Sequence, residues 1–311
     1  MSSFAAIIVT YNRKELLLKN VQAIMEQTAL PNKIYIIDNH GNDGTYAFLN
    51  DSGIKMDSIE YIYLPQNVGG AGGFYHGLKT AFENGHNWFL LMDDDGRPID
   101  KTCFEELFNS LSQKKLTHDN LVFCNSLVLF NETTLSFGLN KLETVDEIIA
   151  SGVMDGNIIE GVANPFNGTL LSRKLVETIG FPNKDFFIRG DEVDYITRAI
   201  NAGSNVFTVF TSRYFHPKNL LMKKKKVFGH EMYVFVDDPV KEYYGARNRI
   251  YSIIQNSKTK KEAKKSIRLF MAKRFYCVFT CKCKKFKTIK MLKLAKKHAF
   301  KGILGPLTTE K

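Results

Sequence analysis

The stretch Trp88-Phe-Leu-Leu-Met-Asp-Asp-Asp95 runs five consecutive apolar residues directly into three consecutive carboxylates. Apolar runs of this length favour the interior of a β-sheet, whereas three aspartates require water or a cation. Both demands are met if a buried strand ends at the carboxyl edge of a parallel sheet, where open α/β sheets bind ligands. Adjacent acids repel one another, and a divalent cation carrying phosphates is their usual partner. The alternative, an acidic start to a helix over residues 100–113, explains Asp95 better than the whole triplet.

Outward from this stretch, the first hundred residues alternate between strand and helix patterns. Strands are expected at residues 4–10, 33–38, 59–64 and 87–92, and helices at residues 13–27, from Thr45 onward and at residues 74–83. Such alternation is typical of a parallel sheet with crossover helices. Polar residues follow every strand, so the strand ends are expected to meet in one crevice.

A glycine run follows the third expected strand, in Asn67-Val-Gly-Gly-Ala-Gly-Gly-Phe74. Interpreted as a turn before a helix, it permits close backbone approach to a ligand and offers free N–H groups to an anion. Its spacing differs from the G-x-G-x-x-G fingerprint of dinucleotide-binding proteins. A merely flexible turn is the alternative, although it explains four glycines in five residues less well.

Composition limits the class of protein. The chain has 311 residues, of which 44% are apolar, so it supports a large core. Five cysteines without a pairing framework suit a reducing compartment, and the group Cys277, Cys281, Cys283 and His298 matches no familiar zinc motif. No secretory signal is evident, and no apolar run reaches the roughly 18 residues that span a bilayer. We therefore expect a soluble or peripheral protein.

Charge divides the chain at about residue 216. Residues 1–216 hold 17 Lys and Arg against 26 Asp and Glu, whereas residues 217–311 hold 26 against 6. In the second part, apolar residues at 267–279 and 286–300 are interleaved with lysines, a pattern that favours interfacial helices on an anionic membrane. Amphipathic helices packed on the domain are the alternative, and nucleic acid is disfavoured. The run Lys223 to Lys226 is expected in an exposed loop.

Several motifs together resemble the metal-dependent, inverting nucleotide-sugar glycosyltransferases of family 2. They are VTYNR (residues 9–13), IID (36–38), NVGGAGGF (67–74), MDDD (92–95), FNGTLL (166–171), FIRGDEVDY (187–195), FH (215–216) and YYGARN (243–248). They occur in the family's order over residues 4–250. The NxGGAGGF form resembles the galactofuranosyl- and rhamnosyltransferase branch.

The resemblance implies the GT-A fold, a Rossmann-like mixed α/β sheet flanked by helices. The catalytic domain would span residues 1–216, with a nucleotide-sugar half at about 1–100 and an acceptor half at about 101–216. Residues 217–311 would form a basic, mainly helical, membrane-associating region.

The resemblance also implies a site. Asp93, Asp95 and His216 would bind Mn²⁺ or Mg²⁺, and imidazole suits Mn²⁺ better. Asp94 would face the donor sugar and ribose, and Asp38 the nucleotide base. The other residues assigned to the donor are Thr10, Tyr11, Arg13, Asn67, Gly69, Gly70, Gly72 and Arg247, with Asn248 beside Arg247 near the donor phosphates or the acceptor. A surface helix cap is the alternative for that last pair.

The transfer reaction also needs a carboxylate that accepts the acceptor's proton. Three acids precede the helix pattern at residues 195–201, and their mutual repulsion raises a pKa toward the useful range. Asp191 matches the family's base. Glu192, Asp194, Phe166, Asn167 and Phe187 are assigned to the acceptor, Phe187 forming a sugar-stacking pair with Phe186. Charge at a helix N-terminus is the alternative for some of the acids.

Together, these assignments predict transfer of a sugar from a nucleotide sugar to a glycan or polyprenyl-linked oligosaccharide during cell-surface polysaccharide synthesis. The location would be cytoplasmic, peripheral on the inner face of the cell membrane. Galactofuranose is the favoured donor sugar, and rhamnose from dTDP-rhamnose is the alternative. A non-catalytic nucleotide- or glycan-binding module is the alternative of another class. No nucleic-acid partner is expected, and the oligomeric state is open.

Overall fold

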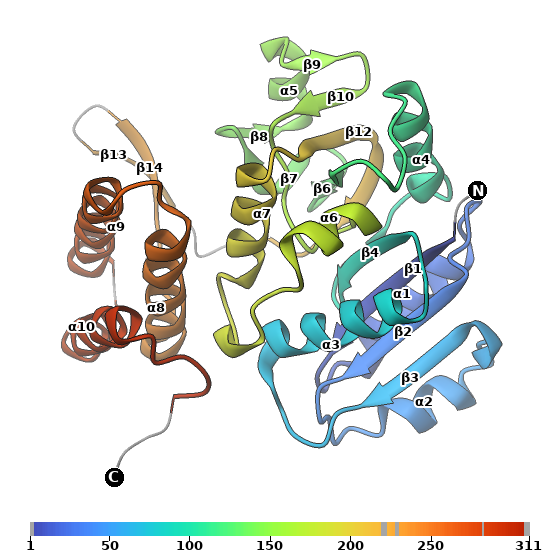
Figure 1. Ribbon diagram of the computed structural model, residues 1–311, viewed down its shortest axis with the longest axis horizontal. Helices are drawn as coiled ribbons and strands as arrows, with labels where there is room; N and C mark the ends of the chain where they lie inside the picture. The colour runs from blue at the N-terminus through green and yellow to red at the C-terminus, as the bar shows by residue number, and fades with distance from the viewer. Residues whose placement is uncertain (1–2, 219–222, 228–229, 282, 308–311) are drawn as a thin grey trace.

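The acidic strand lies in the middle of a mixed sheet. In the computed structural model, which describes residues 3–218, 223–227, 230–281 and 283–307, the sheet has the order β3-β2-β1-β4-β11-β6-β12-β10-β9. The four strands of the first half are β1 (Phe4–Thr10), β2 (Lys33–Asp38), β3 (Ile59–Tyr63) and β4 (Trp88–Asp93). They run parallel, and Val9 lies beside Asp93 at the carboxyl edge. The α/β mixed sheet predicted from the sequence is confirmed (Figure 1).

Helices cover both faces of this sheet. Leu17 of α1 (Lys14–Met25) and Phe104 of α4 (Cys103–Gln113) share one core with Ala6 and Ile8 of β1. The opposite core joins Ile7 of β1 to α3 (Gly69–Glu83), α6 (Arg173–Ile179) and α7 (Asp191–Asn201). Neighbouring residues of β1 thus enter opposite cores, as the period of two in a strand requires. Helix α2 (Thr45–Asp51) and the short 3₁₀ helix Met56–Ser58 connect β2 to β3.

The glycine run belongs to helix α3, and its prediction as a turn was wrong. Helix α3 begins at Gly69, five residues before the expected start. A Cβ atom at Gly73 would lie 2.4 Å from the Val9 side chain, and one at Gly77 would lie 2.5 Å from Ile7. Glycine is therefore needed at both positions to let α3 approach β1 this closely.

The second half of the sheet is mostly antiparallel. Its elements are β5 (Arg97–Pro98), β6 (Val122–Leu129), β7 (Thr134–Leu139), β8 (Leu142–Thr144), α5 (Val145–Ser151), β9 (Met154–Asp155), β10 (Ile158–Glu160), β11 (Thr169–Ser172), the 3₁₀ turn Lys184–Phe186 and β12 (Asn205–Phe215). Strand β11 lies antiparallel between β4 and β6, while β12 runs parallel to β6. The long strand β12 thus ends on the same side of the sheet as β4.

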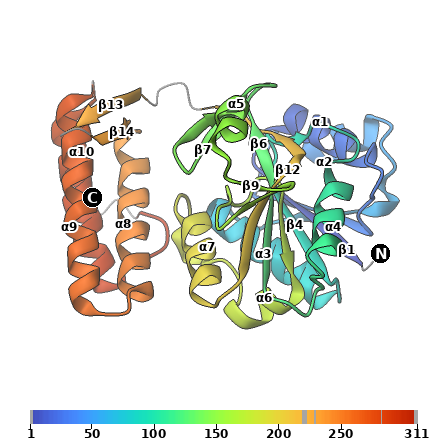
Figure 2. The ribbon, with the colours of Figure 1, turned by 90° about the horizontal axis from the view of Figure 1, so that it is seen from above.

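The C-terminal region is a hairpin followed by three helices, and α8 stands between α7 and α9 (Figure 2). The elements are β13 (Lys223–Val227), β14 (His230–Val234), α8 (Pro239–Asn256), α9 (Lys260–Thr280) and α10 (Lys285–Lys301). The lysine run forms strand β13, so its prediction as a loop was wrong.

Part of the apolar surface expected in the membrane is used instead for helix packing. Ile267, Met271 and Val278 of α9 are buried against α8 and α10, as the packed-helix alternative requires. Leu269 and Phe279 remain exposed, at 63% and 62% of their surface. Among the described residues, no helix is long and apolar enough to cross a membrane.

Candidate active site

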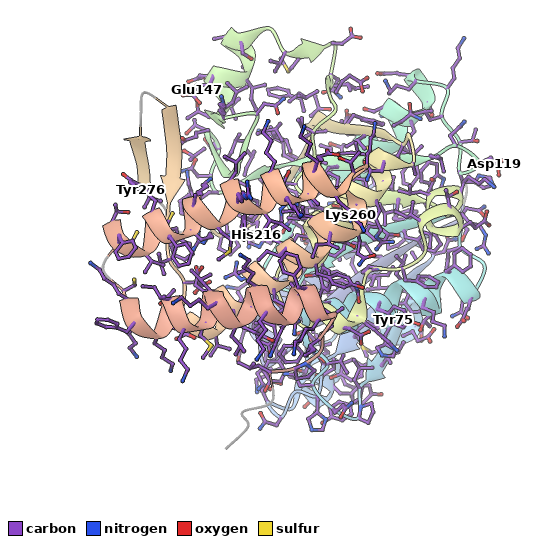
Figure 3. The ribbon with its side chains drawn as sticks, turned by 60° about the vertical axis from the view of Figure 1, so that its left-hand side comes forward. Tyr75, Asp119, Glu147, His216, Lys260 and Tyr276 are labelled. Atoms are coloured by element: carbon purple, nitrogen blue, oxygen red, sulfur yellow. The ribbon has the colours of Figure 1, made fainter. Side chains whose placement is uncertain are left out.

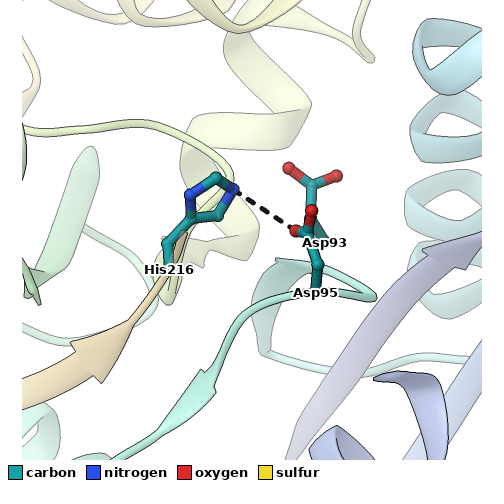
Figure 4. A group of neighbouring side chains, drawn as sticks. All are labelled: Asp93, Asp95 and His216. Carbon is teal, nitrogen blue, oxygen red and sulfur yellow. Dashed lines mark ion pairs between the residues drawn. The ribbon is translucent and has the colours of Figure 1, made fainter. Parts of the chain in front are cut away.

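Three side chains predicted to bind metal lie together at the carboxyl edge of the sheet (Figure 4). Asp93 ends β4, Asp95 follows it in the turn, and His216 follows the last residue of β12. One ligand atom from each side chain lies within 4.8 Å of the others. The sequence separation of more than 120 residues is bridged by the pairing of β5 with β12, which sets Phe215 beside Arg97.

The protonation state of His216 suits it to bind a cation. Its Nδ1 lies 2.7 Å from the Pro217 carbonyl oxygen, which can only accept a hydrogen bond, so Nδ1 carries the proton. In the neutral ring, Nε2 then presents a lone pair to Asp95 Oδ1 at 3.3 Å. Burial lowers the pKa of His216 and favours this neutral form. Two acceptor atoms that face each other in this way require a cation or a proton between them.

The acids provide the complementary charge. Burial raises the pKa of Asp93 well above its usual range, and the carboxylates of Asp95 and Asp94 raise it further. Asp95 Oδ1 is buried and accepts no hydrogen bond from the described residues. A buried carboxylate oxygen without a donor is costly unless a positive charge neutralises it. The three side chains therefore fit a divalent cation with oxygen and nitrogen ligands.

Asp94 is turned away from its neighbours and into the protein. It is 4% exposed and accepts hydrogen bonds from Thr10 Oγ1 at 2.9 Å and from Arg13 Nη1 at 3.0 Å. The same Arg13 nitrogen lies 2.9 Å from Asp95 Oδ2. Asp94 is not among the residues that line the neighbouring cavity, and its contact with the donor sugar and ribose stays a prediction. Asp94 orients Arg13, which is half exposed beside the acids.

Asp38 and two asparagines organise the adjoining loops. Asp38 is 2% exposed and accepts hydrogen bonds from the Gly41 amide at 2.7 Å and from the Tyr61 hydroxyl. Asn67 Oδ1 accepts from Asn39 Nδ2 at 3.1 Å and from the Gly69 amide at 2.8 Å. These contacts fix the entry into α3, while Tyr11 remains 46% exposed at the strand edge.

Gly69 is the glycine whose backbone conformation matters most. Its φ is +73°, and a Cβ atom there would lie 2.0 Å from the Phe187 carbonyl oxygen. That oxygen accepts a hydrogen bond from the Ala71 amide at 3.1 Å. The start of α3 is thereby tied to the segment before α7. Gly70 has open space around it and lines the cavity, whereas a Cβ atom at Gly72 would meet Val68.

Asp191 and Glu192 open helix α7 on the other side of the same cavity. Asp191 is 5% exposed, and burial raises the pKa of Asp191 well above its ordinary value, with neighbouring Glu192 raising it further. Glu192 accepts a hydrogen bond from the Gly190 amide at 2.9 Å. Because its pKa is raised in this way, the Asp191 carboxylate is a stronger proton acceptor once it is ionised.

One cavity of about 520 Å³ joins the two groups of acids. Phe74 and Phe166 lie side by side in its wall, with ring centroids 4.6 Å apart. Asn167 Oδ1 is buried there without a hydrogen-bond donor among the described residues. The residues that line the cavity include Gly70, Asp93, Phe166, Asn167, Asp191, Glu192 and His216. The fold thus brings together the predicted metal ligands, the predicted base and several predicted acceptor contacts.

Asp194 and the phenylalanine pair do not line this cavity, contrary to expectation. Asp194 pairs with Arg198 at 3.0 Å and accepts a hydrogen bond from Asn256 at 3.0 Å. Phe186 is completely buried, and the Phe187 ring packs on Tyr244 with a centroid distance of 5.3 Å. These side chains attach α7 and its preceding loop to α8, so the predicted sugar-stacking pair is wrong.

Arg247 and Asn248 also face inward. Both side chains are 0% exposed, and Arg247 donates to the carbonyl oxygens of Gly305 at 2.6 Å and Phe186 at 3.0 Å. A guanidinium without exposed surface cannot contact a donor phosphate in this conformation. The assignment of Arg247 to the donor is therefore wrong, and so is the surface helix cap.

Four other groups at or beside the site have no role assigned from the sequence. Phe137, Ile188 and Arg189 line the cavity from β7 and from the loop before α7. The Tyr214 hydroxyl is buried without a partner among the described residues, and a Cβ atom at Gly96 would lie 2.6 Å from it. Tyr214 lies in β12, where no strand is predicted from the sequence, so its burial is a finding of the structure.

Known proteins are similar to this chain in sequence. The family model described as "Glycosyl transferase family 2" matches residues 5–151. The galactofuranosyltransferase GlfT1 of Mycolicibacterium smegmatis is 30% identical over 256 residues, covering 80% of this chain and 82% of the relative. The dTDP-rhamnosyl transferase RfbF of Shigella flexneri is 22% identical over 263 residues, with 82% and 81% covered.

A solved structure shows the same fold at low sequence identity. GalNAc-T7 with UDP, GalNAc and Mn²⁺ superposes with a TM-score of 0.62 at 14% identity, covering 97% of this chain and 56% of that one. At this identity the likeness concerns the GT-A fold. With the extensive match to GlfT1, it leads to one assignment: the chain belongs to glycosyl transferase family 2.

Proposed function

We propose that this glycosyltransferase moves a galactofuranosyl group from UDP-galactofuranose to a hydroxyl of a glycan acceptor, with inversion at the anomeric carbon and with a divalent cation. The observation that carries the proposal is that one cavity is lined by Asp93 and His216, from the ends of strands, and by Asp191, from the start of α7. Transfer requires the groups that stabilise the leaving diphosphate and the group that accepts the hydroxyl proton to share one such cavity.

The donor sugar is chosen by comparing the sequence identities to the relatives. Identity to the galactofuranosyltransferase is 30%, against 22% to the dTDP-rhamnosyl transferase, at similar coverage. Galactofuranose is therefore favoured, and rhamnose is the second candidate.

Asp191 is the proton acceptor in the proposed reaction. The bond from the acceptor oxygen to the anomeric carbon forms as the bond from that carbon to the diphosphate breaks, and the hydroxyl proton passes to Asp191. The raised pKa of Asp191, caused by burial and by Glu192, matches it to this task near neutral pH. Asp93, Asp95 and His216 would hold Mn²⁺ or Mg²⁺. When bound, the cation supplies positive charge that stabilises the leaving diphosphate.

The cavity wall suits a sugar acceptor. Phe74 and Phe166 line the cavity beside the acids, although each is only 3% exposed, and Asn167 Oδ1 lacks a donor that a sugar hydroxyl would supply. These features support a glycan or a lipid-linked oligosaccharide as the acceptor.

The proposal is tested by measuring UDP or dTDP release from UDP-galactofuranose and dTDP-rhamnose, with Mn²⁺ or with EDTA, and with an octyl galactofuranoside as acceptor. Turnover of UDP-galactofuranose that EDTA abolishes is expected. Faster turnover of dTDP-rhamnose would make rhamnose the donor sugar in place of galactofuranose. Donor-induced thermal stabilisation without product from either sugar would favour the non-catalytic binding module instead.

We further propose that the exposed surface of α9 and α10 contacts the inner face of an anionic membrane. Phe279 and Phe286 are 62% and 91% exposed among lysines, a combination typical of interfacial helices. Figure 3 shows α9 crossing this face from Lys260 to Tyr276. Flotation with anionic but not with zwitterionic vesicles is expected, and Phe286→Glu should weaken it. Equal flotation with both vesicles, or with neither, would contradict the electrostatic contact.

A further inference from the structure

The loop before Asp191 is held in an uncommon backbone conformation. We call residues 186–190 the base loop. Phe187, Arg189 and Gly190 have φ values of +65°, +67° and +88°, and two of these residues carry side chains that disfavour this region. Such conformations persist only where the surroundings impose them. The position of Asp191 at the start of α7 therefore depends on what holds this loop.

Asn248 of α8 holds it directly. Its Nδ2 lies 2.9 Å from the Phe186 carbonyl oxygen, 3.0 Å from that of Ile188 and 2.7 Å from that of Arg189. One amide group thus gathers three carbonyls whose directions set the path of the base loop. A Cβ atom at Gly190 would lie 3.3 Å from Asn248 Cβ, so loop and helix are also in close contact.

Arg247 completes the clamp. Its Nε donates to Asn248 Oδ1 at 2.9 Å and fixes the amide orientation, while Nη2 lies 3.0 Å from the Phe186 carbonyl oxygen. Nη1 donates to the Gly305 carbonyl at 2.6 Å, and the Gly305 amide donates to the Asp185 carbonyl at 2.6 Å. The segment after α10 is thereby tied to the same loop.

Burying the charged guanidinium of Arg247 costs free energy that a purely structural position does not require. The described residues include no carboxylate in an ion pair with it, and its guanidinium lies against the rings of Tyr243 and Tyr244, at 5.4 and 5.0 Å. A buried charge of this kind usually stabilises a fold less than an apolar side chain of similar volume. The four directed hydrogen bonds that its Nε, Nη1 and Nη2 donate explain the choice of arginine.

From these contacts we propose that Arg247 and Asn248 are positioning residues that hold the base loop and so aim Asp191 into the cavity. The C-terminal helices then form part of the catalytic apparatus in addition to any membrane role. The proposal rests on the proposed role of Asp191 as the base. The metal ligands lie at or just after the ends of β4 and β12, away from the clamp on α8, so the clamp acts on the acceptor side of the reaction.

The test compares full-length wild type with Asn248→Ala and Arg247→Lys. Arg173→Met is the matched control, because Arg173 also donates to two carbonyls, those of Phe82 and His86, but lies away from the cavity. Amide hydrogen exchange is measured over residues 186–192, with Mn²⁺ affinity and with the pH dependence of kcat on UDP-galactofuranose and an octyl galactofuranoside.

Faster exchange in this segment and a kcat reduced by about tenfold to a hundredfold are expected for Asn248→Ala, since small displacements of a reacting group cost about that much. Arg247→Lys should reduce kcat by a smaller factor. The Mn²⁺ affinity should stay unchanged in both variants. The pKa that governs kcat should fall in both, because water reaches Asp191. The control should lower Tm without altering these readouts.

Unchanged exchange over residues 186–192 in both variants, or wild-type kcat in both, would overturn the proposal. If Asp191→Asn keeps full turnover, the proposed base is wrong, which is a separate result. In that case hydrogen exchange alone decides whether Arg247 and Asn248 hold the loop, and unchanged exchange again refutes it.

Discussion

The two sides of the cavity are built in different ways. The side with Asp93, Asp95 and His216 consists of strand ends, fixed by the hydrogen bonds of β4, β5 and β12. The side with Asp191 consists of a loop in left-handed conformations, held by side chains of α8. A sheet edge places its residues through the backbone, whereas the base loop depends on a few side-chain contacts. This difference predicts that substitutions far from the cavity disturb the base side. The metal side should tolerate such substitutions, because the backbone of the sheet places its residues.

The largest expected effect tests whether the base side does the chemistry. Asp191→Asn should lower kcat by about 10²–10⁴-fold, because general base catalysis contributes about this much. Binding of UDP-galactofuranose with Mn²⁺, followed by thermal shift, should persist. Asp194→Asn is the matched control in the same helical turn, since Asp194 pairs with Arg198 outside the cavity. It should lower Tm and leave kcat close to wild type, and a wild-type kcat in Asp191→Asn would exclude Asp191 as the base.

The next effect concerns the metal side. His216→Ala should weaken Mn²⁺ binding by at least about tenfold, since even residues that only orient metal ligands contribute this much. Free Mn²⁺ measured by electron paramagnetic resonance gives the affinity. His118→Ala serves as the control, because His118 lies outside the cavity lining. Equal Mn²⁺ affinity in the two variants would remove His216 from the ligand set.

The two sides should also differ in how pH affects stability. Burial and neighbouring acids raise the pKa values of Asp93 and Asp191 above those of the unfolded chain. Their contribution to stability is therefore present below the unfolded pKa of about 4 and is lost as the pH rises through the raised values. In EDTA, Tm should fall over this window.

Mn²⁺ binds ionised Asp93 and should reverse the Asp93 part of this loss, so that its stabilising effect grows with pH. Melting curves in EDTA and in Mn²⁺ across pH 5 to 8 measure both effects. A Mn²⁺ shift in Tm that shrinks as pH rises would contradict this view of Asp93. The same ionisation of Asp191 should make kcat increase with pH.

The smallest expected effect lies where the start of α3 contacts the base loop. Gly69→Ala should destabilise the fold by about 1–3 kcal/mol, because alanine is strained at φ +73° and meets the Phe187 carbonyl. Gly70→Ala, with open space and an ordinary φ, should be neutral or stabilising by up to about 1 kcal/mol. Chemical denaturation measures both, and similar values for the two variants would argue that the tie between α3 and the base loop is weak.

Prediction from the sequence succeeded where a short pattern sets the geometry. The run of residues 88–95 indicated a buried strand ending in acids, and β4 has this form. The alternation of strands and helices predicted the parallel half of the sheet to within about two residues at the strand ends. His216 was assigned through the family resemblance, since no local pattern connects it to residues 93–95.

Prediction failed where a side chain has several possible partners. Nothing near Asp94 indicates that Thr10 and Arg13 engage both of its oxygens, or that Arg198 and Asn256 take Asp194. Arg247 lies within the motif YYGARN (residues 243–248), whose resemblance suggested a place near the donor, but the direction of its side chain is decided by how α8 packs on the base loop. Except for Asp194 and Arg198, which are four residues apart on α7, these contacts join residues that are far apart in sequence, so no local pattern contains them.

The sequence by itself determined the strand that delivers acids to a sheet edge, because hydrophobic periodicity and charge are local properties of the chain. The tertiary structure decided which acids face the cavity, that His216 meets Asp95, and that a buried arginine and asparagine hold the base loop. The physical reason is that burial and hydrogen-bond direction depend on neighbours that only folding brings together.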